Sequence, residues 1–413
     1  MNIINCKKIL DAHNTYISPF FVYILSFITL FVFYILHWST LYPKMSISLL
    51  IFILGTSFVM LLMGFYFYRK KLFIYYPSKS SPEKLIKWTK YYLLANLVEI
   101  LYSHHIPLLN GLRGEELPDD VNFFGIPMFH ILVLSFGAFL SLMIFHKMRS
   151  DKSTRRRMLP YFALSFLAPI IIYGRGILFM TLTGCFFIYL MSLSRIRKKI
   201  LFCIFLGMTL LFVFGVLGDV RIGASDSRFV NRKNGVSITV LGEATQQFQD
   251  SWIPHEYMWG YIYAISPIGN LQYNINEHDD VSPTLSSLFE LCSMEMFSET
   301  VSKRLVSFEK RQEDLVIPPL NVSTIYARPY LIMGWWGMIL IFFYTIIYII
   351  VVFMIISPSS EYFVVSIAIV NVIISYNLFN NMFAYGGYAN VIFIPLVLNI
   401  GEFVKRLKKS VYD

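Results

Sequence analysis

The chain has 413 residues, of which 56% are hydrophobic, 17% aromatic and only 15% charged. Soluble domains average about 45–50% apolar and about 25% charged residues, so this composition excludes an ordinary soluble protein and predicts a polytopic membrane protein. A formal net charge of +10 would favour nucleic-acid binding in a soluble protein. Here the basic residues lie between apolar runs, which makes them a topology signal, and no nucleic-acid partner is expected.

Ten apolar runs approach the length of about 20 residues that a helix needs to cross a bilayer. We therefore expect an all-α membrane protein with about ten transmembrane helices. The predicted spans are 18–37, 46–68, 88–109, 122–146, 158–174, 176–194, 200–217, 330–355, 362–379 and 387–404.

The basic residues predict the orientation of these spans. With the N-terminus in the cytoplasm, 23 of the 35 Lys and Arg residues fall on cytoplasmic segments, and the short outer segments hold only Lys44, Arg113 and Arg175. By the positive-inside rule, both termini are predicted to be cytoplasmic and the long loop to lie outside. The chain then divides into a seven-span bundle over 1–217, an outer loop with short amphipathic helices over 218–329, and a three-span bundle over 330–413.

The outer loop is the one long polar segment of the chain. Loops of this length are usually functional or disordered, and the aromatic content argues against disorder. Trp and Tyr side chains over 251–271 favour the headgroup level of a bilayer. Residues 283–311 are predicted to form one helix, with Ser282 as N-cap and Pro283 at its first position.

Three arginines are predicted near the outer membrane surface: Arg175 between two glycines, Arg221 after a span exit, and Arg328 before a span entry. A guanidinium group pairs bidentately with phosphate oxygens, which suits a pyrophosphate at the headgroup level. A single arginine at a helix end often only snorkels to the interface. Three of them on the side that disfavours cations favour a functional interpretation.

His255, Glu256 and Asp219 are the candidate bases for a reaction on the outer side, because a histidine or carboxylate there could take a proton from an attacking hydroxyl. Solvated loop carboxylates are common, so each alone is more often inert. His104 and His105 at the outer end of the third span are a further option, and Glu99 inside that span stays unassigned.

Several kinds of site are excluded. The four cysteines have neither CxxC nor metal-ligand spacing, so no disulfide and no metal site are expected. The P-loop, Rossmann, HExxH and GxSxG patterns are all missing, which argues against a familiar soluble nucleotide-using fold and gives no reason to expect a cofactor.

The layout resembles the bacterial oligosaccharide repeat-unit polymerases, also called O-antigen polymerases, over nearly the whole chain. The similar segments are Asn14–Pro19, Gly174–Gly176, Gly218–Arg221, Tyr261–Leu271 in the long outer loop, and Tyr326–Gly337. The resemblance implies a metal-independent, C-type-like glycosyltransferase of the bacterial inner membrane. Such enzymes transfer a growing glycan from undecaprenyl diphosphate onto another lipid-linked repeat unit on the periplasmic face.

The resemblance also implies roles for individual residues and partners. Arg175, Arg221 and Arg328 would hold the donor pyrophosphate, and His255, Glu256 or Asp219 would serve as base or orient the acceptor. Sugars or the lipid interface would be contacted by Trp259, Tyr261, Tyr263 and Asn270. The implied partners are undecaprenyl-diphosphate-linked glycans, membrane lipid, a chain-length regulator and a flippase.

Two other functions fit the same sequence. An O-antigen ligase, which moves the finished polymer to a lipid core, has a similar layout. A lipid-linked oligosaccharide flippase would also bind undecaprenyl diphosphate, but it predicts basic residues along a path through the bilayer, whereas the arginines here gather at one face.

Overall fold

The computed structural model describes residues 12–113, 124–172, 174–193, 236–306, 309–318 and 320–412, with short runs between 207 and 218. Two strands, β1 (His13–Asn14) and β2 (Ile74–Tyr75), form one short antiparallel pair, and the other regular elements are helices. The all-α prediction is confirmed at this level over the described residues. In chain order the helices are α1 (Pro19–Ile35), α2 (Ile47–Arg69), α3 (Pro82–Ser103), α4 (Pro107–Leu112), α5 (Phe129–Ser150), α6 (Arg155–Leu167), η2 (Ala168–Ile172), α7 (Arg175–Met191), α10 (Val236–Leu241), α11 (Gln246–Gln249), α12 (Tyr257–Glu277), α13 (Leu285–Glu295), α14 (Glu299–Leu305), α15 (Ala327–Ile355), α16 (Phe363–Tyr376), α17 (Gly386–Ala389), η3 (Asn390–Ile392) and α18 (Phe393–Tyr412).

Among the described residues, three helices are long and apolar enough to cross a membrane, namely α2, α5 and α15. They lie at the second, fourth and eighth predicted spans. Shorter apolar helices lie at the first, sixth, ninth and tenth, over Pro19–Ile35, Arg175–Met191, Phe363–Tyr376 and Gly386–Gly401. Most of the predicted span 200–217 lies outside the described residues. The described part of the chain is therefore helical with three candidate membrane spans, and the count of ten stays a prediction.

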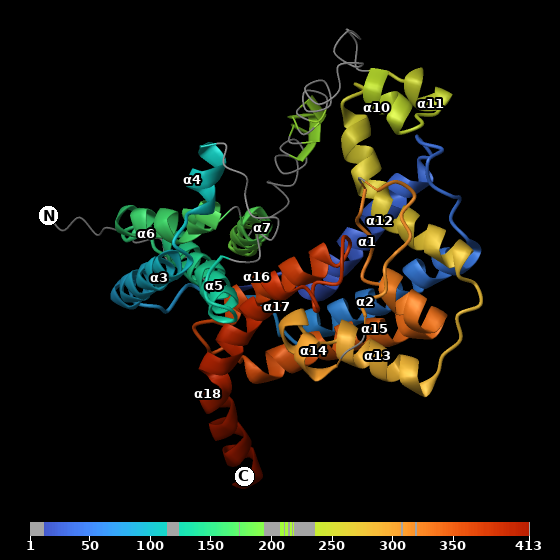
Figure 1. The fold of residues 1–413 in the computed structure, drawn as a ribbon. Coiled ribbons are helices and arrows are strands. Elements are labelled where there is room, and N and C mark those ends of the chain that lie inside the picture. Colours follow the sequence, from blue (N-terminus) through green and yellow to red (C-terminus); the bar gives the residue numbers. More distant parts are fainter. Residues whose placement is uncertain are drawn as a thin grey trace, which may run out of the picture.

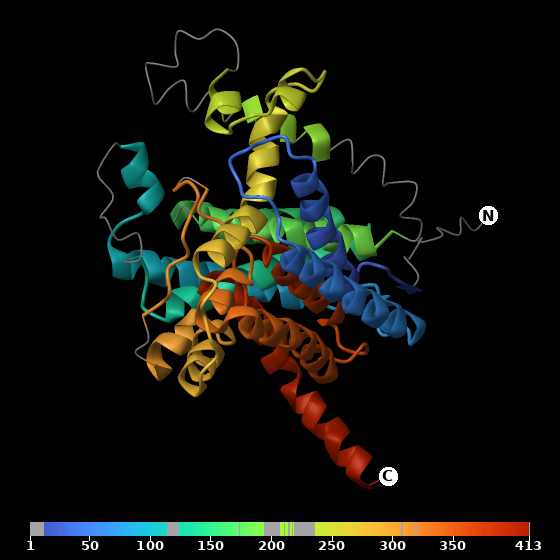
Figure 2. The same ribbon diagram turned by 90° about the vertical axis from the view of Figure 1, so that its right-hand side faces the viewer.

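Helix α16 lies centrally in the bundle (Figure 1). Every residue from Phe363 to Ile374 is buried, as expected for a helix that is apolar on all sides. It contacts α1, α5 and α7. In contrast, α18 leads away from the rest of the molecule toward the C-terminus in both views (Figures 1 and 2).

Segments predicted to lie on the same side of the membrane bond to one another. On the predicted cytoplasmic side, the Ser80 hydroxyl donates to the Glu361 carboxylate at 2.8 Å. On the predicted outer side, the backbone N–H of Ile325 donates to the Asn377 carbonyl at 2.8 Å. These contacts agree with the predicted alternation of the spans, while the assignment of each side rests on the count of basic residues.

Within the predicted outer loop, α12 is a 21-residue helix packed against α1 and α15, and it carries α10 and α11 at its N-terminal end (Figures 1 and 2). The predicted helix over 283–311 is two helices instead, α13 and α14. The N-cap of α13 is Thr284, whose side chain forms a capping box with Ser287, so the prediction of Ser282 as N-cap is wrong. A break before Ser298 lets the Glu299 N–H bond the Ala384 carbonyl at 2.8 Å.

Helix α15 is kinked near its start. Met333 and Gly334 have non-helical backbone angles, and φ of Gly334 is +60°. A Cβ atom at this position would lie 2.9 Å from the Val281 carbonyl oxygen. The kink sets the first two turns, which carry Arg328, at an angle to the long apolar part of the helix.

We expect Gly334→Ala to destabilise the folded chain by about 1–3 kcal/mol, because alanine is strained at a positive φ and meets a carbonyl oxygen there. Thermal unfolding of the purified protein measures the effect. Gly55→Ala is the matched control, since a Cβ at Gly55 in α2 meets nothing within 4 Å and alanine favours a helix over glycine. Equal unfolding temperatures for the two variants would contradict the structural role of the kink.

Candidate functional site

A charge cluster lies at the start of α15. Its members are Arg328, Glu295, Glu313 and Lys310, together with the amide of Asn380. The Arg328 side chain is only 6% exposed, and its Nη1 and Nε lie 3.3 Å from Glu295 Oε1 and 3.2 Å from Glu313 Oε1. Its Nη2 also donates to Asn380 Oδ1 at 2.7 Å. One guanidinium group therefore holds two carboxylates and an amide from three separate parts of the chain.

Two elements bring Glu295 and Asn380 to this point. Glu295 is the last residue of α13. The side chain of Asn381 donates to both the carbonyl and the carboxylate of Glu295, each at 2.8 Å. Asn380 and Asn381 lie in the connection between α16 and α17, where Asn377 Oδ1 also accepts from the Met382 N–H at 2.9 Å. Hydrogen bonds thus hold the polar residues after α16 in place beside Arg328.

The segment that carries Glu313 is fixed by α12. Asn274 donates to the Asp314 carbonyl at 2.7 Å and accepts from the Asp314 N–H at 3.0 Å. Asn270, which is fully buried, donates to the carbonyls of Leu320 and Val322 at 2.8 Å each. Buried amides that are satisfied in this way specify one backbone arrangement. Helix α12 is therefore the scaffold that positions Glu313.

The two carboxylates of the cluster differ in their surroundings. Glu295 is 2% exposed and Glu313 is 17% exposed. Burial raises the pKa of Glu313, repulsion from Glu295 adds to the rise, and Arg328, Ser323 and Lys310 oppose it. A carboxylate with a raised pKa is a better proton acceptor, which is a property of general bases in enzymes.

Lys310 is the second cation of the cluster. The pKa of Lys310 is lowered, because desolvation and repulsion from Arg328 outweigh the attraction of Glu299, Glu295 and Glu313. Two cations and two carboxylates thus share the site, and Lys310 lies on its more exposed side. The arrangement can bind an anion near Lys310 and move a proton at Glu313.

Of the three predicted arginines, Arg328 lies in the charge cluster and Arg175 lies at the start of α7. Arg175 is exposed at the first position of α7. Its side chain forms no hydrogen bond or ion pair with another described residue. A Cβ at the neighbouring Gly176 would lie 3.6 Å from the Tyr385 hydroxyl. The Tyr385 N–H in turn bonds the Asn381 carbonyl at 3.1 Å. Both arginines therefore border the connection after α16, whereas Arg221 and Asp219 lie outside the described residues.

The predicted bases His255 and Glu256 lie elsewhere. They precede the first turn of α12, with His255 Nε2 3.6 Å from Glu256 Oε1. The Glu313 segment is bound at Asn274, 18 residues further along the chain, which corresponds to roughly 27 Å at 1.5 Å per helical residue. The structure thus separates the predicted bases from Arg328.

The residues predicted to contact sugar or lipid are spread along α12. The rings of Trp259 and Tyr263 stack 6.4 Å apart near its N-terminal end. Tyr261 is buried, and its hydroxyl accepts from the Trp38 N–H at 2.9 Å. The bonds of Asn270 to the 314–322 segment favour a structural role for this amide over the predicted sugar contact.

Glu295, Glu313 and Lys310 were not singled out from the sequence. One signal does mark two of them: the run Lys310, Arg311, Glu313 is a local concentration of charge between an amphipathic stretch and Pro318–Pro319. Glu295 offers no comparable signal, because it ends a helix among apolar residues.

Among the described residues, no three His, Cys, Asp or Glu side chains are grouped so that they could hold a metal ion. No protein-family model matches the chain, and no curated protein or solved structure matches it either. The function is therefore argued from the geometry of the charge cluster and from the resemblance of the sequence segments.

Proposed function

We propose that this protein polymerises undecaprenyl-diphosphate-linked oligosaccharide repeat units into O-antigen or a similar surface polysaccharide by glycosyl transfer on the periplasmic face of the bacterial inner membrane. The observation that carries the proposal is the buried charge cluster at the start of α15, together with the exposed Arg175 at the start of α7. Intramembrane and membrane-border charges are costly and usually mark a site. Exposed cations next to an apolar span suit a lipid-linked diphosphate.

The proposed donor contact is Arg175. Its guanidinium group is exposed at the start of α7, directly after Gly174. Two of its N–H groups can bond one diphosphate in a bidentate manner. Lys310, the exposed cation of the charge cluster, is the second proposed contact and would stabilise charge that develops on the leaving diphosphate.

The proposed base is Glu313. In the reaction, the acceptor hydroxyl oxygen forms a bond to the anomeric carbon of the donor sugar. The bond from that carbon to the diphosphate oxygen breaks, and undecaprenyl diphosphate leaves with the electron pair. The hydroxyl proton passes to the Glu313 carboxylate. Arg328 acts through Glu313, since it holds the carboxylate in place and keeps it ionised more readily than burial alone would allow.

This assignment departs from the roles inferred from sequence. His255 and Glu256 lie before the first turn of α12, too far from the Asn274 end that holds the Glu313 segment to act on the same bond, so they are not proposed as bases. Arg328 is already engaged by two carboxylates and an amide, and it is proposed as a positioning residue. The implied partners, a flippase and a chain-length regulator, would deliver the repeat units and limit the polymer length.

The proposal is tested with the glycan ladder of a deletion strain complemented with the wild-type gene or with Arg175→Ala, with expression checked by blot. We expect the deletion to leave single-repeat glycans, and Arg175→Ala to lower the polymer yield at least tenfold, as for other positioned charge-stabilising donors. Arg304→Ala is a control, because Arg304 is an exposed arginine in the last turn of α14, also on the predicted outer side. Loss of all surface glycan, single repeats included, would overturn the proposal in favour of flipping or ligation.

A further inference from the structure

Helix α13 buries polar side chains and exposes apolar ones. Its residues Ser287, Glu290 and Glu295 are buried, whereas Leu285 is 84% exposed. The buried groups have partners inside the protein, and Arg311 donates to both carboxylate oxygens of Glu290, at 2.8 and 3.0 Å. A helix that lies between a protein and water has the opposite arrangement, with its polar face outward.

The outward face of α13 is an apolar row. Leu285, Phe289 and Cys292 follow one another at spacings of four and three residues, which places them on one face of the helix. Phe297, directly after the helix, is 49% exposed. Charged or polar residues are expected at such positions on a helix in water. The row therefore indicates contact with an apolar medium.

Helix α15 carries an apolar row of the same kind. The exposed side chains of this row recur at helical spacing and are Trp336, Phe343, Ile347, Val351 and Met354. Because α15 is a candidate membrane span, this is the face that would meet lipid. Leu340 lies on the same face, and it belongs to one apolar cluster with Leu288 and Leu291 of α13. Helix α13 thus lies beside α15 on its lipid-facing side (Figure 1).

The position of α13 along α15 gives its depth. The exposed Trp336 directly follows the kink at Gly334, and tryptophan favours the membrane interface. Tyr344 lies eight residues further on, roughly 12 Å along the helix axis. Its hydroxyl donates to the Met296 carbonyl at the end of α13, at 2.6 Å. Half of a hydrocarbon core is about 15 Å thick, so this contact corresponds to a depth inside one leaflet.

The turn between α13 and α14 has the backbone partners that this depth requires. Non-helical backbone is tolerated inside a bilayer only where protein or a water-filled cavity covers it. The Glu295 carbonyl accepts from the Asn381 side chain at 2.8 Å, and the Glu299 N–H donates to the Ala384 carbonyl at 2.8 Å. The Met296 carbonyl has its bond from α15. The polar groups of the turn are therefore satisfied without water.

The chain then returns toward the side from which it came. Lys303 and Arg304 are exposed in the last turn of α14, where long cationic side chains can extend to the headgroups. Arg311 lies again beside Glu290 in the middle of α13, and it also donates to the Leu331 carbonyl at 2.7 Å. A segment that enters and leaves a membrane on one side is re-entrant.

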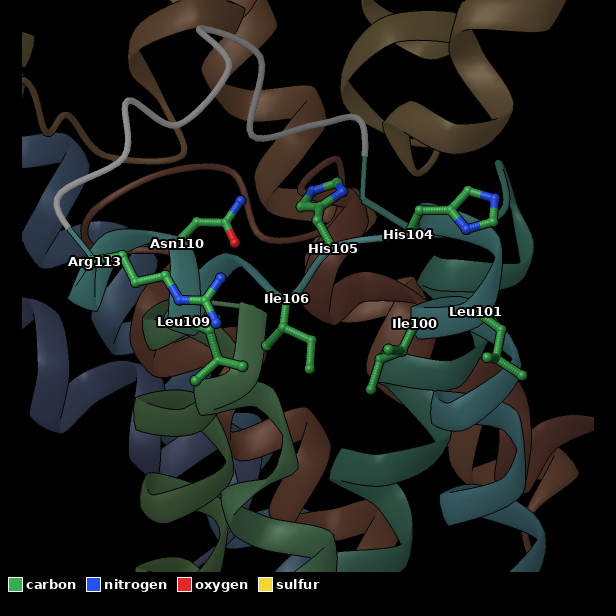
Figure 3. Close-up of a pocket in the computed structure, with 8 residues that line it drawn as sticks. All are labelled: Ile100, Leu101, His104, His105, Ile106, Leu109, Asn110 and Arg113. Atoms are coloured by element: carbon green, nitrogen blue, oxygen red, sulfur yellow. The ribbon is translucent and has the colours of Figure 1, made fainter.

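The outer end of the third predicted span differs from α13. Between α3 and α4 lies a hollow of about 520 Å³. In Figure 3 its polar lining residues lie above its apolar ones, with His104, His105 and Asn110 over Ile100, Leu101 and Ile106. The lining changes from apolar to polar within a few residues, as expected at a headgroup boundary. The outward row of α13, from Leu285 to Cys292, stays apolar.

We propose that α13 and the turn after it form a re-entrant element of the outer leaflet, with the Leu285 face against lipid acyl chains. Helix α14 brings the chain back to the headgroup level. Because Glu295 ends α13, the charge cluster then lies below the headgroups. The inference stands apart from the glycosyl-transfer proposal, since it concerns the position of α13 and its test measures no activity.

The test uses the full-length protein in lipid nanodiscs, with a spin label on single cysteines and the four native cysteines replaced by alanine. Collisions with O₂, which concentrates among acyl chains, are compared with collisions with a nickel chelate confined to water. We expect Leu285→Cys and Phe297→Cys to collide more with O₂, as Ile347→Cys on the α15 row should. Glu309→Cys is the aqueous control, because Glu309 is an exposed carboxylate beyond α14.

A preference of Leu285→Cys for the nickel chelate, equal to that of Glu309→Cys, would place α13 in water and overturn the proposal. Few collisions with either reagent would show a protein partner on this face, and short spin–spin distances would identify it as a second copy. Both results would also overturn the lipid assignment.

A second measurement needs no cysteine replacement and serves if the alanine background does not fold. Leu285→Trp adds a fluorophore at an exposed position of the otherwise unchanged chain. Its added emission should be quenched by brominated acyl chains in the nanodisc and not by acrylamide in the water. Quenching by acrylamide alone would overturn the proposal.

Discussion

Arg328→Met is expected to abolish polymer formation and to lower the free energy of unfolding by about 3–5 kcal/mol, the usual cost of removing one partner from a buried ion pair. Arg328 is 6% exposed and contacts Glu295, Glu313 and Asn380 at once. Methionine fills a similar length but leaves two carboxylates in a buried site without their shared cation. Both the fold around α13 and the position of Glu313 depend on that cation.

A double variant separates the two contributions. In Arg328→Met with Glu295→Met, the more deeply buried carboxylate is removed together with its cation. Replacing a buried ion pair by apolar side chains is often close to neutral for stability, so unfolding should return toward the wild-type temperature. Polymer formation should not return, because Glu313 still lacks its positioning partner.

The measurements are the glycan ladder, expression by blot and thermal unfolding of the purified protein. Lys303→Met is the control from the same region, since Lys303 is 71% exposed and its pair with Glu299 is worth at most about 1 kcal/mol. A full ladder from Arg328→Met at normal expression would show that the charge cluster has no part in the reaction.

The apolar runs predicted much of the fold because a buried or lipid-facing helix corresponds to one continuous apolar segment of the sequence. Helices α2, α5 and α15 lie where such runs predict them. Helix α12 was harder to recognise as a packed helix, because Asn270, Gln272 and Asn274 interrupt its apolar character. These amides are buried and satisfied by distant backbone groups, such as the Ser46 N–H that donates to Gln272 at 2.8 Å.

The charge cluster shows where prediction from one sequence stops. Arg328 was predicted as a site residue because it lies just before an apolar run, which is a local signal in the sequence. Its partners Glu295 and Glu313 lie 33 and 15 residues away, and the pairing depends on the break between α13 and α14 and on the segment fixed by α12. No local pattern encodes those contacts. His255 and Glu256 were predicted from their residue types and their place in the outer loop, and neither carries information on distance to Arg328.

Glu313→Gln is expected to lower the rate of glycosyl transfer by about 10²–10⁴-fold, the usual contribution of a general base, and to leave the fold intact. The amide oxygen of glutamine can still accept from Arg328. Stability is not expected to suffer at neutral pH. The pKa of Glu313 is raised in the folded chain. Ionisation of this carboxylate therefore lowers the free energy of unfolding as pH rises above the ordinary pKa of a glutamate. Glutamine does not ionise and removes this effect.

Glu309→Gln is the matched control, because Glu309 is an exposed carboxylate four residues earlier. The rates are measured with the purified protein and a synthetic lipid-linked repeat unit. Wild-type activity for Glu313→Gln, or an equal loss for Glu309→Gln, would refute the assignment of Glu313 as the base.

The pH dependence of the rate gives an independent test, because its direction depends on the neighbours of Glu313. A base must be ionised, so the rate falls as pH drops through the raised pKa of Glu313. Lys310 lowers this pKa and Glu295 raises it. Lys310→Met should therefore move the acidic limb of the rate profile to higher pH, and Glu295→Gln should move it to lower pH. Shifts in the same direction for both variants, or no shift in either, would mean that another group accepts the proton.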